Sequence, residues 1–121
     1  MASQSQLILV DLKRATVDLI FEGPVLEWVA ISADGAWAVT TGVSPDWDYF
    51  KHDWTGPRTV RLFDLKQRSC VRTWEAHRGF ISDLALSSDG KCLATASRDR
   101  TAQLFDLKNE RILGLWRRSR T

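Results

Sequence analysis

Cysteine is scarce in this sequence, and the two that are present, Cys70 and Cys92, lack the spacing of metal ligands. The small number argues against a disulfide framework, and the spacing argues against a zinc site. We therefore interpret both as small buried hydrophobic residues in a reducing compartment. Motifs that carry catalysis are also missing, because the sequence has no phosphate-cradling loop, no redox motif and no nucleophile elbow. No cofactor is predicted.

Long apolar runs are absent as well. No stretch approaches the roughly 20 apolar residues that a membrane span needs, and the first six residues lack the basic and apolar regions of a signal peptide. The net charge is only +2, so no overall field attracts nucleic acid or an anionic membrane. The sequence favours a soluble cytoplasmic protein. Its basic end, residues 117–121, is interpreted as a solvated tail, with a phosphate or acidic-partner contact as the alternative.

No segment has the periodicity of a helix. Apolar residues instead gather in ten short runs between polar turns, which predicts an all-β protein. Asp-Gly pairs at 34–35 and 89–90 supply the positive φ of tight hairpin turns. The run at 25–32 does not alternate strictly, so we expect a strand buried on both faces, with Leu26, Val29 and Ile31 inside. The ten expected strands are 7–11, 16–21, 25–32, 37–41, 59–63, 70–74, 80–86, 92–96, 102–105 and 112–116.

What the sequence does contain is a repeat. Residues 59–66, which read Thr-Val-Arg-Leu-Phe-Asp-Leu-Lys, recur almost unchanged at 101–108 and more loosely at 6–13. Aspartates 11, 64 and 106, which close the three copies, are separated by 53 and then 42 residues. Periods of this size are typical of stacked sheet units, such as propeller blades of four strands each.

The second half of the chain resembles a WD-repeat (Trp-Asp) β-propeller blade. Ala-His at 76–77, Ser-Ser-Asp-Gly at 87–90 and Phe-Asp at 105–106 stand where that family has Gly-His, Ser-Pro-Asp-Gly and Trp-Asp. The match over residues 69–116 is close, and residues 15–68 resemble a more divergent blade. The resemblance implies four-stranded antiparallel sheets whose strands are named a to d from the central channel outward.

On that resemblance the chain holds about two and a half blades. Residues 7–21 are strands c and d of a half blade, residues 25–74 are a full blade, and residues 80–116 are a second full blade. A propeller closes with four to eight blades, so a partial propeller of this size would leave large apolar faces open. Three explanations stay open: completion by another chain, completion by a copy of this chain, or a fragment of a longer protein.

The resemblance also implies a buried polar network in the last blade. His77, Ser97 and Asp99 stand at the family positions, with Thr95 a less favoured choice for the hydroxyl. Phe105 takes the place of the family tryptophan and has no N–H to donate. A Ser–His–Asp set also suggests a hydrolase, but no oxyanion-hole candidate accompanies it. A structural role is therefore favoured, and no enzyme activity is predicted. The first full blade has Gly-Pro where the histidine should be and is expected to be weaker.

Residues 44–56 interrupt the repeat. From the Asp-Gly turn to the threonine of strand c there are 24 residues in the first full blade (35 to 59) and 11 in the second (90 to 101), so a b–c loop carries a 13-residue insertion. Exposed loop aromatics are the residue types of binding hot spots. A hairpin extension that packs on its own blade fits equally well. Neither calcium-loop nor zinc spacing is present, so no metal is predicted. The insertion's partner-binding candidates are Trp47, Tyr49, Phe50, His52 and Trp54.

These features favour a non-catalytic protein–protein interaction scaffold that binds a protein partner through its b–c and d–a loop face. Arg98 and Arg100 flank Asp99 on that face and are further contact candidates, although a solvated turn is the simpler interpretation. Neither a membrane nor nucleic acid is expected as a partner. The alternative is a ligand-sensing or regulatory propeller segment of a larger signalling or defence protein.

Overall fold

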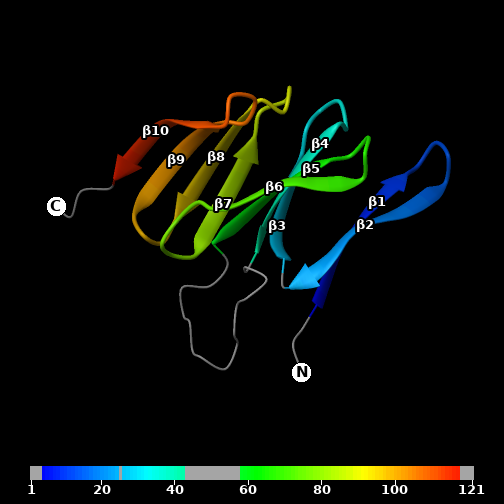
Figure 1. The fold of residues 1–121 in the computed structure, drawn as a ribbon, viewed down its shortest axis with the longest axis horizontal. Helices are drawn as coiled ribbons and strands as arrows, with labels where there is room; N and C mark the ends of the chain where they lie inside the picture. Colours follow the sequence, from blue (N-terminus) through cyan, green and yellow to red (C-terminus); the bar gives the residue numbers. More distant parts are fainter. Residues whose placement is uncertain (1–3, 25, 43–57, 118–121) are drawn as a thin grey trace.

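The computed structural model describes residues 4–24, 26–42 and 58–117. Within these residues the chain is all-β, with ten strands in three antiparallel sheets, as the sequence predicted (Figure 1). The strands are β1 (Gln4–Asp11), β2 (Thr16–Pro24), β3 (Leu26–Ile31), β4 (Trp37–Gly42), β5 (Thr59–Asp64), β6 (Ser69–Glu75), β7 (Ile81–Leu86), β8 (Cys92–Ser97), β9 (Thr101–Asp106) and β10 (Arg111–Arg117).

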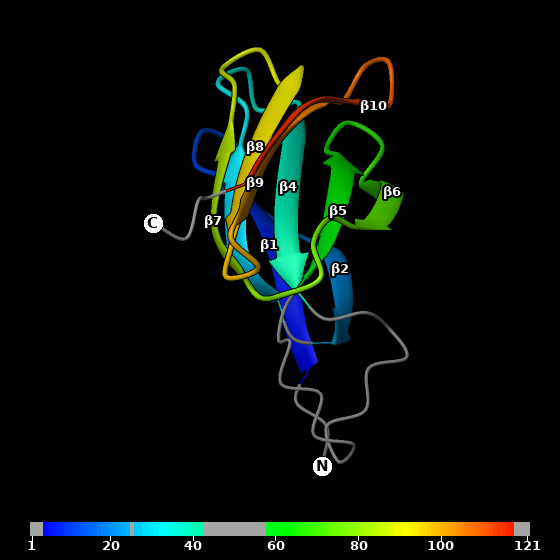
Figure 2. The ribbon, with the colours of Figure 1, turned by 90° about the vertical axis from the view of Figure 1, so that its left-hand side faces the viewer.

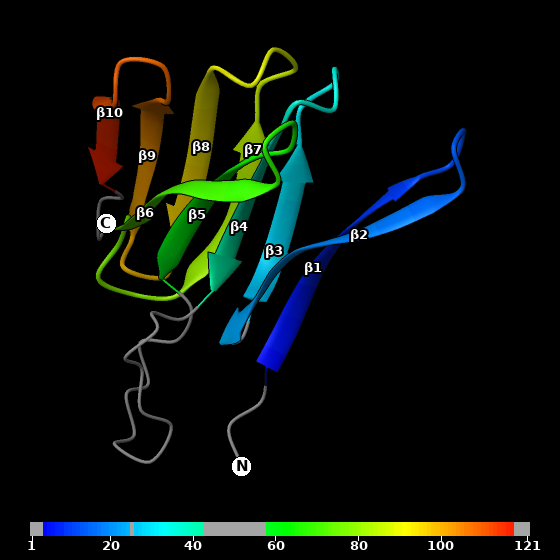
Figure 3. The same ribbon diagram turned by 45° about the vertical axis from the view of Figure 1, so that its right-hand side comes forward.

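The three sheets follow one another in chain order. Strands β1 and β2 form a hairpin, β3 to β6 form a four-stranded meander, and β7 to β10 form a second one with the same order. The sheets lie side by side, with the β3–β6 sheet between the other two (Figures 1 and 3). Figure 2 views the molecule from the β10 side. The middle sheet therefore has a neighbouring sheet on each side, whereas the first and last sheets each have one neighbour and one outer face.

The Asp-Gly turns are built in the same way in both four-stranded sheets. Between β3 and β4, the Ser32 hydroxyl and the Ala36 N–H donate to the Asp34 carboxylate at 2.6 and 3.0 Å. Gly35 takes φ of +71°, a conformation that costs glycine nothing. Residues 87–91 repeat this arrangement, with distances of 2.7 and 3.0 Å and φ of +75° at the glycine.

The repeated aspartate found in the sequence lies at the start of the β1–β2, β5–β6 and β9–β10 turns. In each copy its Oδ1 accepts two backbone N–H bonds from the turn, at 3.0 and 3.2 Å for Asp11, 2.9 and 3.2 Å for Asp64, and 3.1 and 3.1 Å for Asp106. The fourth residue after each aspartate has a positive φ although it is not glycine. These residues are Ala15 (55°), Arg68 (59°) and Glu110 (56°).

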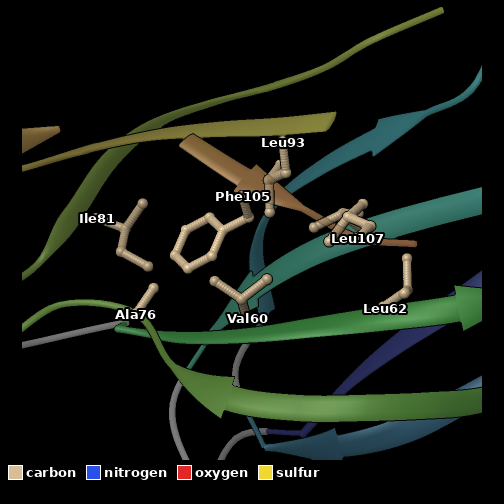
Figure 4. Close-up of a cluster of buried hydrophobic side chains, with 8 residues drawn as sticks. Val60, Leu62, Ala76, Ile81, Leu93, Phe105 and Leu107 are labelled. Carbon is tan, nitrogen blue, oxygen red and sulfur yellow. The ribbon is translucent and has the colours of Figure 1, made fainter. Parts of the chain in front are cut away.

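The main core lies between the two four-stranded sheets (Figure 4). Val60 and Leu62 of β5 meet Ile81, Leu93 and Phe105 of the last sheet, and all five are at most 6% exposed. Apolar burial of this kind supplies the largest favourable contribution to stacking the sheets. Phe105 of this core also packs edge to face on Trp74, with the two ring centroids 5.5 Å apart.

A second, smaller core joins the hairpin to the middle sheet. Phe63 is fully buried there, and its ring packs edge to face on Phe21 at 5.5 Å. The Arg61 guanidinium lies 5.3 Å from the Phe21 ring centre, and the residue is only 1% exposed. Burial lowers the pKa of Arg61, because the charged form loses hydration. A buried cation thus sits at the interface between the first two sheets.

The sequence prediction for β3 was wrong. Val29 is 61% exposed and Ile31 is 55% exposed, whereas a strand buried on both faces was expected. The strand pairs only with β4, and no described element covers the face that carries Val29 and Ile31. Its apolar character is therefore not covered within the described part of the chain.

Candidate interaction site

The side chain of His77, in the linker between β6 and β7, is fully buried. Its Nδ1 lies 3.1 Å from Asp99 Oδ2 and 2.8 Å from Thr101 Oγ1, and its Nε2 lies 2.7 Å from Thr95 Oγ1. The Thr101 hydroxyl donates to the other Asp99 oxygen, so its oxygen is free to accept from the imidazole. Both ring nitrogens are thus satisfied, which a buried imidazole requires.

The hydroxyl that touches the imidazole belongs to Thr95, which the sequence analysis had ranked below Ser97. Thr95 lies within β8 and is 2% exposed. Ser97 ends β8, where its hydroxyl donates to the Phe80 carbonyl at 2.9 Å and accepts the Asp99 N–H at 3.1 Å. Ser97 therefore holds the turn that carries Asp99, and it is not hydrogen-bonded to His77 in the described structure. The nucleophile–base pair of a hydrolase is not formed by these residues.

Asp99 is the acceptor on which this network converges. Burial alone would raise the pKa of Asp99, but hydrogen bonds from the Thr101 side chain and backbone outweigh it. The Arg78 N–H, at 3.1 Å, and the charge of His77 act in the same direction, so the pKa of Asp99 lies below its ordinary value. The carboxylate ties the β8–β9 turn to the β6–β7 linker. Thr101 and Arg78 were not predicted as members of the network, because their hydrogen bonds to it depend on the conformation of this turn.

The middle sheet has the same hydroxyls without the histidine. Thr40 pairs with Arg61 across β4 and β5, as Thr95 pairs with Gln103 across β8 and β9. Thr40 and Thr59 are both 1% exposed, and neither hydroxyl has a hydrogen-bond partner among the described residues. By sequence position, residues 23–24 (Gly-Pro) replace the histidine. Burying these two hydroxyls without partners lowers the stability of the middle sheet. The last sheet avoids this cost, because its equivalent hydroxyls bind His77.

The partner-binding candidates divide into two groups. Those of the 44–56 insertion, Trp47, Tyr49, Phe50, His52 and Trp54, lie outside the described residues. Arg98 and Arg100 are described, and both are exposed in the β8–β9 turn. The Arg98 guanidinium stacks 5.3 Å from the Phe80 ring centre, and the backbone N–H of Arg98 donates to the Phe80 carbonyl at 2.9 Å. The two arginines thus lie at the same rim as the β6–β7 linker.

The outer face of the last sheet is apolar and open. Trp116 of β10 stands ten residues after Asp106, as Trp74 of β6 stands ten residues after Asp64. Trp74 packs on Phe105 of the next sheet, whereas Trp116 is 59% exposed. The two tryptophans occupy equivalent positions in their sheets, but Trp74 is packed against the next sheet and Trp116 is exposed.

The hairpin has an open apolar face of its own. Ile8 pairs with Leu19, and Val10 pairs with Val17. These four side chains are 48–65% exposed, while the opposite face of the hairpin packs on the middle sheet. The two ends of the stack thus both present uncovered apolar surface.

Two features are absent from the described residues. Within residues 4–24, 26–42 and 58–117, no three side chains of the metal-ligating types His, Cys, Asp and Glu come together. The same residues contain no helix with the length and apolar character to cross a membrane.

Comparison with protein families and curated proteins places these features in a known context. The family model described as WD domain, G-beta repeat matches residues 68–106. The chain is 26% identical over 120 residues to eukaryotic translation initiation factor 3 subunit I of Culex quinquefasciatus, covering 99% of this chain and 36% of that protein. It is 38% identical over 61 residues to the guanine nucleotide-binding protein subunit beta of Oryza sativa subsp. indica, covering 50% and 16%. The chain therefore spans about a third, or less, of these relatives.

Solved structures share the fold at low sequence identity. A chain of a mitotic checkpoint complex crystal structure aligns with a TM-score of 0.72 and 16% identity, covering 98% of this chain and 33% of that one. The β-propeller domain of Cps50 (Swd1) from Myceliophteria thermophila aligns with a TM-score of 0.57 and 21% identity, covering 74% and 24%.

Proposed function

We propose that this chain is a WD-repeat β-propeller protein and acts as a non-catalytic scaffold for protein–protein interaction, because residues 68–106 match the WD-repeat family model and solved propellers share its fold. The propeller families of its relatives are generally non-catalytic. The buried imidazole of His77 supports the same proposal, because every polar atom of its ring is used inside the blade. We place the protein in a reducing compartment such as the cytoplasm, where the free thiols of Cys70 and Cys92 are stable.

The chain contributes two blades and a half to a propeller that further blades complete, supplied by another part of a longer protein, by another chain or by a copy. On this proposal residues 7–21 are the half blade, residues 25–74 and 80–116 are the full blades, and residues 117–121 are a basic tail. The observation that carries the proposal is the contrast between Trp74, packed on the next sheet, and Trp116, 59% exposed at the equivalent place. A neighbouring blade on β10 would bury Trp116 as the last sheet buries Trp74.

The partner binds at the rim formed by the b–c and d–a loops. The turn that carries Arg98 and Arg100 lies there beside the linker that carries His77, held together by the Asp99 hydrogen bonds. Loops fixed on a rigid scaffold are favourable places for recognition.

Light scattering coupled to size-exclusion chromatography tests the completion of the propeller. The wild-type chain should show a mass above that of a monomer that increases with concentration, and Trp116→Asp should lower it to the monomer. Val71→Asp is the matched control, because Val71 is 48% exposed on β6 and lies away from the open faces. A wild-type chain that stays a stable monomer across the concentration series would refute completion by another copy.

A further inference from the structure

A groove of about 1000 Å³ crosses the loop rim beside the His77 network. We infer that this groove binds an extended anionic segment of a protein partner, an inference that rests on the proposed loop-face function. We call it the arginine groove, defined by Arg58, Arg78, Arg100, Arg117, Glu75 and Asp99.

Four segments of the chain bring these side chains together. Glu75 and Arg78 belong to the end of β6 and the linker that follows, and the Arg78 N–H bonds Asp99 at 3.1 Å. Arg100 lies in the β8–β9 turn, and Arg117 of β10 pairs with Thr101, which follows it. The Arg58 carbonyl accepts the Ala76 N–H at 3.2 Å, which brings the start of β5 to the same place. Hydrogen bonds in which backbone groups take part therefore fix the segments that form the groove.

Both carboxylates of the groove already have partners within the chain. Glu75 lies 3.5 Å from Arg58, and Asp99 accepts hydrogen bonds from His77, Thr101 and the Arg78 backbone. The guanidinium groups of Arg78, Arg100 and Arg117 have no carboxylate within 4.0 Å among the described residues. All three residues are exposed. The groove thus presents three uncompensated cations to solvent.

Arg100 occupies a backbone conformation that does not suit it. Its φ is +72°, in the left-handed region that glycine adopts without cost and other residues rarely adopt. The turn alone would be better served by glycine. The arginine side chain is therefore placed at this rim against the local preference of the backbone, and Arg100→Gly removes a groove cation without straining the turn.

The occupant should be a protein segment and not a nucleic acid. Guanidinium groups bind carboxylate and phosphate oxygens in the same two-pronged geometry, so the shared chemistry is a run of anionic side chains, acidic or phosphorylated. The wall of the groove includes Leu115, which is 53% exposed, and the side chain of Ala76. Three cations beside apolar wall residues suit a short peptide, whereas nucleic-acid affinity grows with the number of phosphates neutralised.

Fluorescence anisotropy with labelled probes tests the inference. The probes are an oligoglutamate peptide, a phosphoserine-containing peptide and an oligothymidylate of matched charge, each titrated with the chain at low and at physiological ionic strength. The Arg78→Ala/Arg100→Gly variant should bind the better peptide at least roughly tenfold more weakly than wild type. The matched control, Lys91→Ala/Lys108→Ala, removes two exposed cations at the opposite rim and should leave binding unchanged.

The outcomes separate the possibilities. The peptide that keeps its affinity at physiological ionic strength identifies the anion as carboxylate or phosphate. Equal weakening by both double variants would show a general charge effect and overturn the inference, as would tighter binding of the oligothymidylate. Light scattering separates this inference from the proposed function. Peptide binding that the arginine variant loses, in a wild-type chain that does not assemble, refutes completion by a copy and leaves the groove supported. Assembly of a wild-type chain that shows no specific peptide binding refutes the groove alone.

Discussion

The two four-stranded sheets offer a paired experiment on one threonine position. Thr95 and Thr40 occupy equivalent places in strand b, are 2% and 1% exposed, and differ in one respect. The Thr95 hydroxyl is 2.7 Å from His77 Nε2, whereas the Thr40 hydroxyl has no hydrogen-bond partner within residues 4–24, 26–42 and 58–117. Replacing each threonine by valine keeps the shape and the β-branched backbone preference while removing the hydroxyl.

The two substitutions should change the free energy of unfolding in opposite directions. Thr95→Val leaves a buried imidazole nitrogen unpaired and should cost roughly 1–3 kcal/mol. Thr40→Val removes a buried hydroxyl that has no partner and should stabilise the chain by about 1 kcal/mol. The difference between the two variants is then about 2–4 kcal/mol, several times the usual effect of a surface substitution.

Urea unfolding followed by tryptophan fluorescence measures both variants against wild type, with the slope of the transition checked for constancy. Thr95→Ser is the control that restores a hydroxyl and should recover most of the loss. If both valine variants shifted the free energy of unfolding by the same amount in the same direction, the His77 network would not be what distinguishes the two sheets.

Four further substitutions test other parts of the molecule. Asp99→Asn should destabilise the chain by roughly 1–3 kcal/mol at neutral pH. The pKa of Asp99 is lower in the folded than in the unfolded chain, so ionised Asp99 stabilises the fold fully above the unfolded pKa of about 4. This stabilisation is lost as the pH falls through the folded pKa. The free energy of unfolding of Asp99→Asn, measured with urea, should therefore depend less on pH in that acid range than the wild-type value does. Gly35→Ala should cost about 1 kcal/mol through its φ of +71°, and Gly90→Ala should cost more, because its added Cβ would lie 3.0 Å from Trp37; thermal unfolding compares them. Glu110→Gly should raise the stability by about 0.5 kcal/mol in the same assay, because glycine relieves its φ of +56°.

Much of the fold was predictable because its signals are local. The Asp-Gly pairs predicted two turns that the structure contains, and the recurring aspartates marked the turns that end β1, β5 and β9. Ten apolar runs predicted ten strands, since each run matches one strand to within a few residues. These features depend on a few neighbouring residues, so the sequence alone carries them.

The features that were missed depend on how distant segments meet. Local pattern gives both Thr95 and Ser97 a hydroxyl near Asp99, and only the position of the imidazole selects Thr95. The exposure of Val29 depends on which face of β3 other elements cover, which no local pattern reports. The arginine groove needs four segments held in one arrangement. Of its cations, Arg100 had been singled out as a contact candidate, and Arg117 only as part of the basic end, for which an acidic-partner contact was the alternative interpretation.

The central claim is that the outer face of the β7–β10 sheet is an interface and not a solvent-facing surface. Fluorescence of the dye anilinonaphthalene sulfonate, which reports exposed apolar surface, measures this most directly on dilute chain that still unfolds cooperatively. The account predicts a strong signal from wild type that Trp116→Asp reduces and Val71→Asp leaves unchanged. A folded wild-type chain that gives no more signal than Trp116→Asp would contradict the claim.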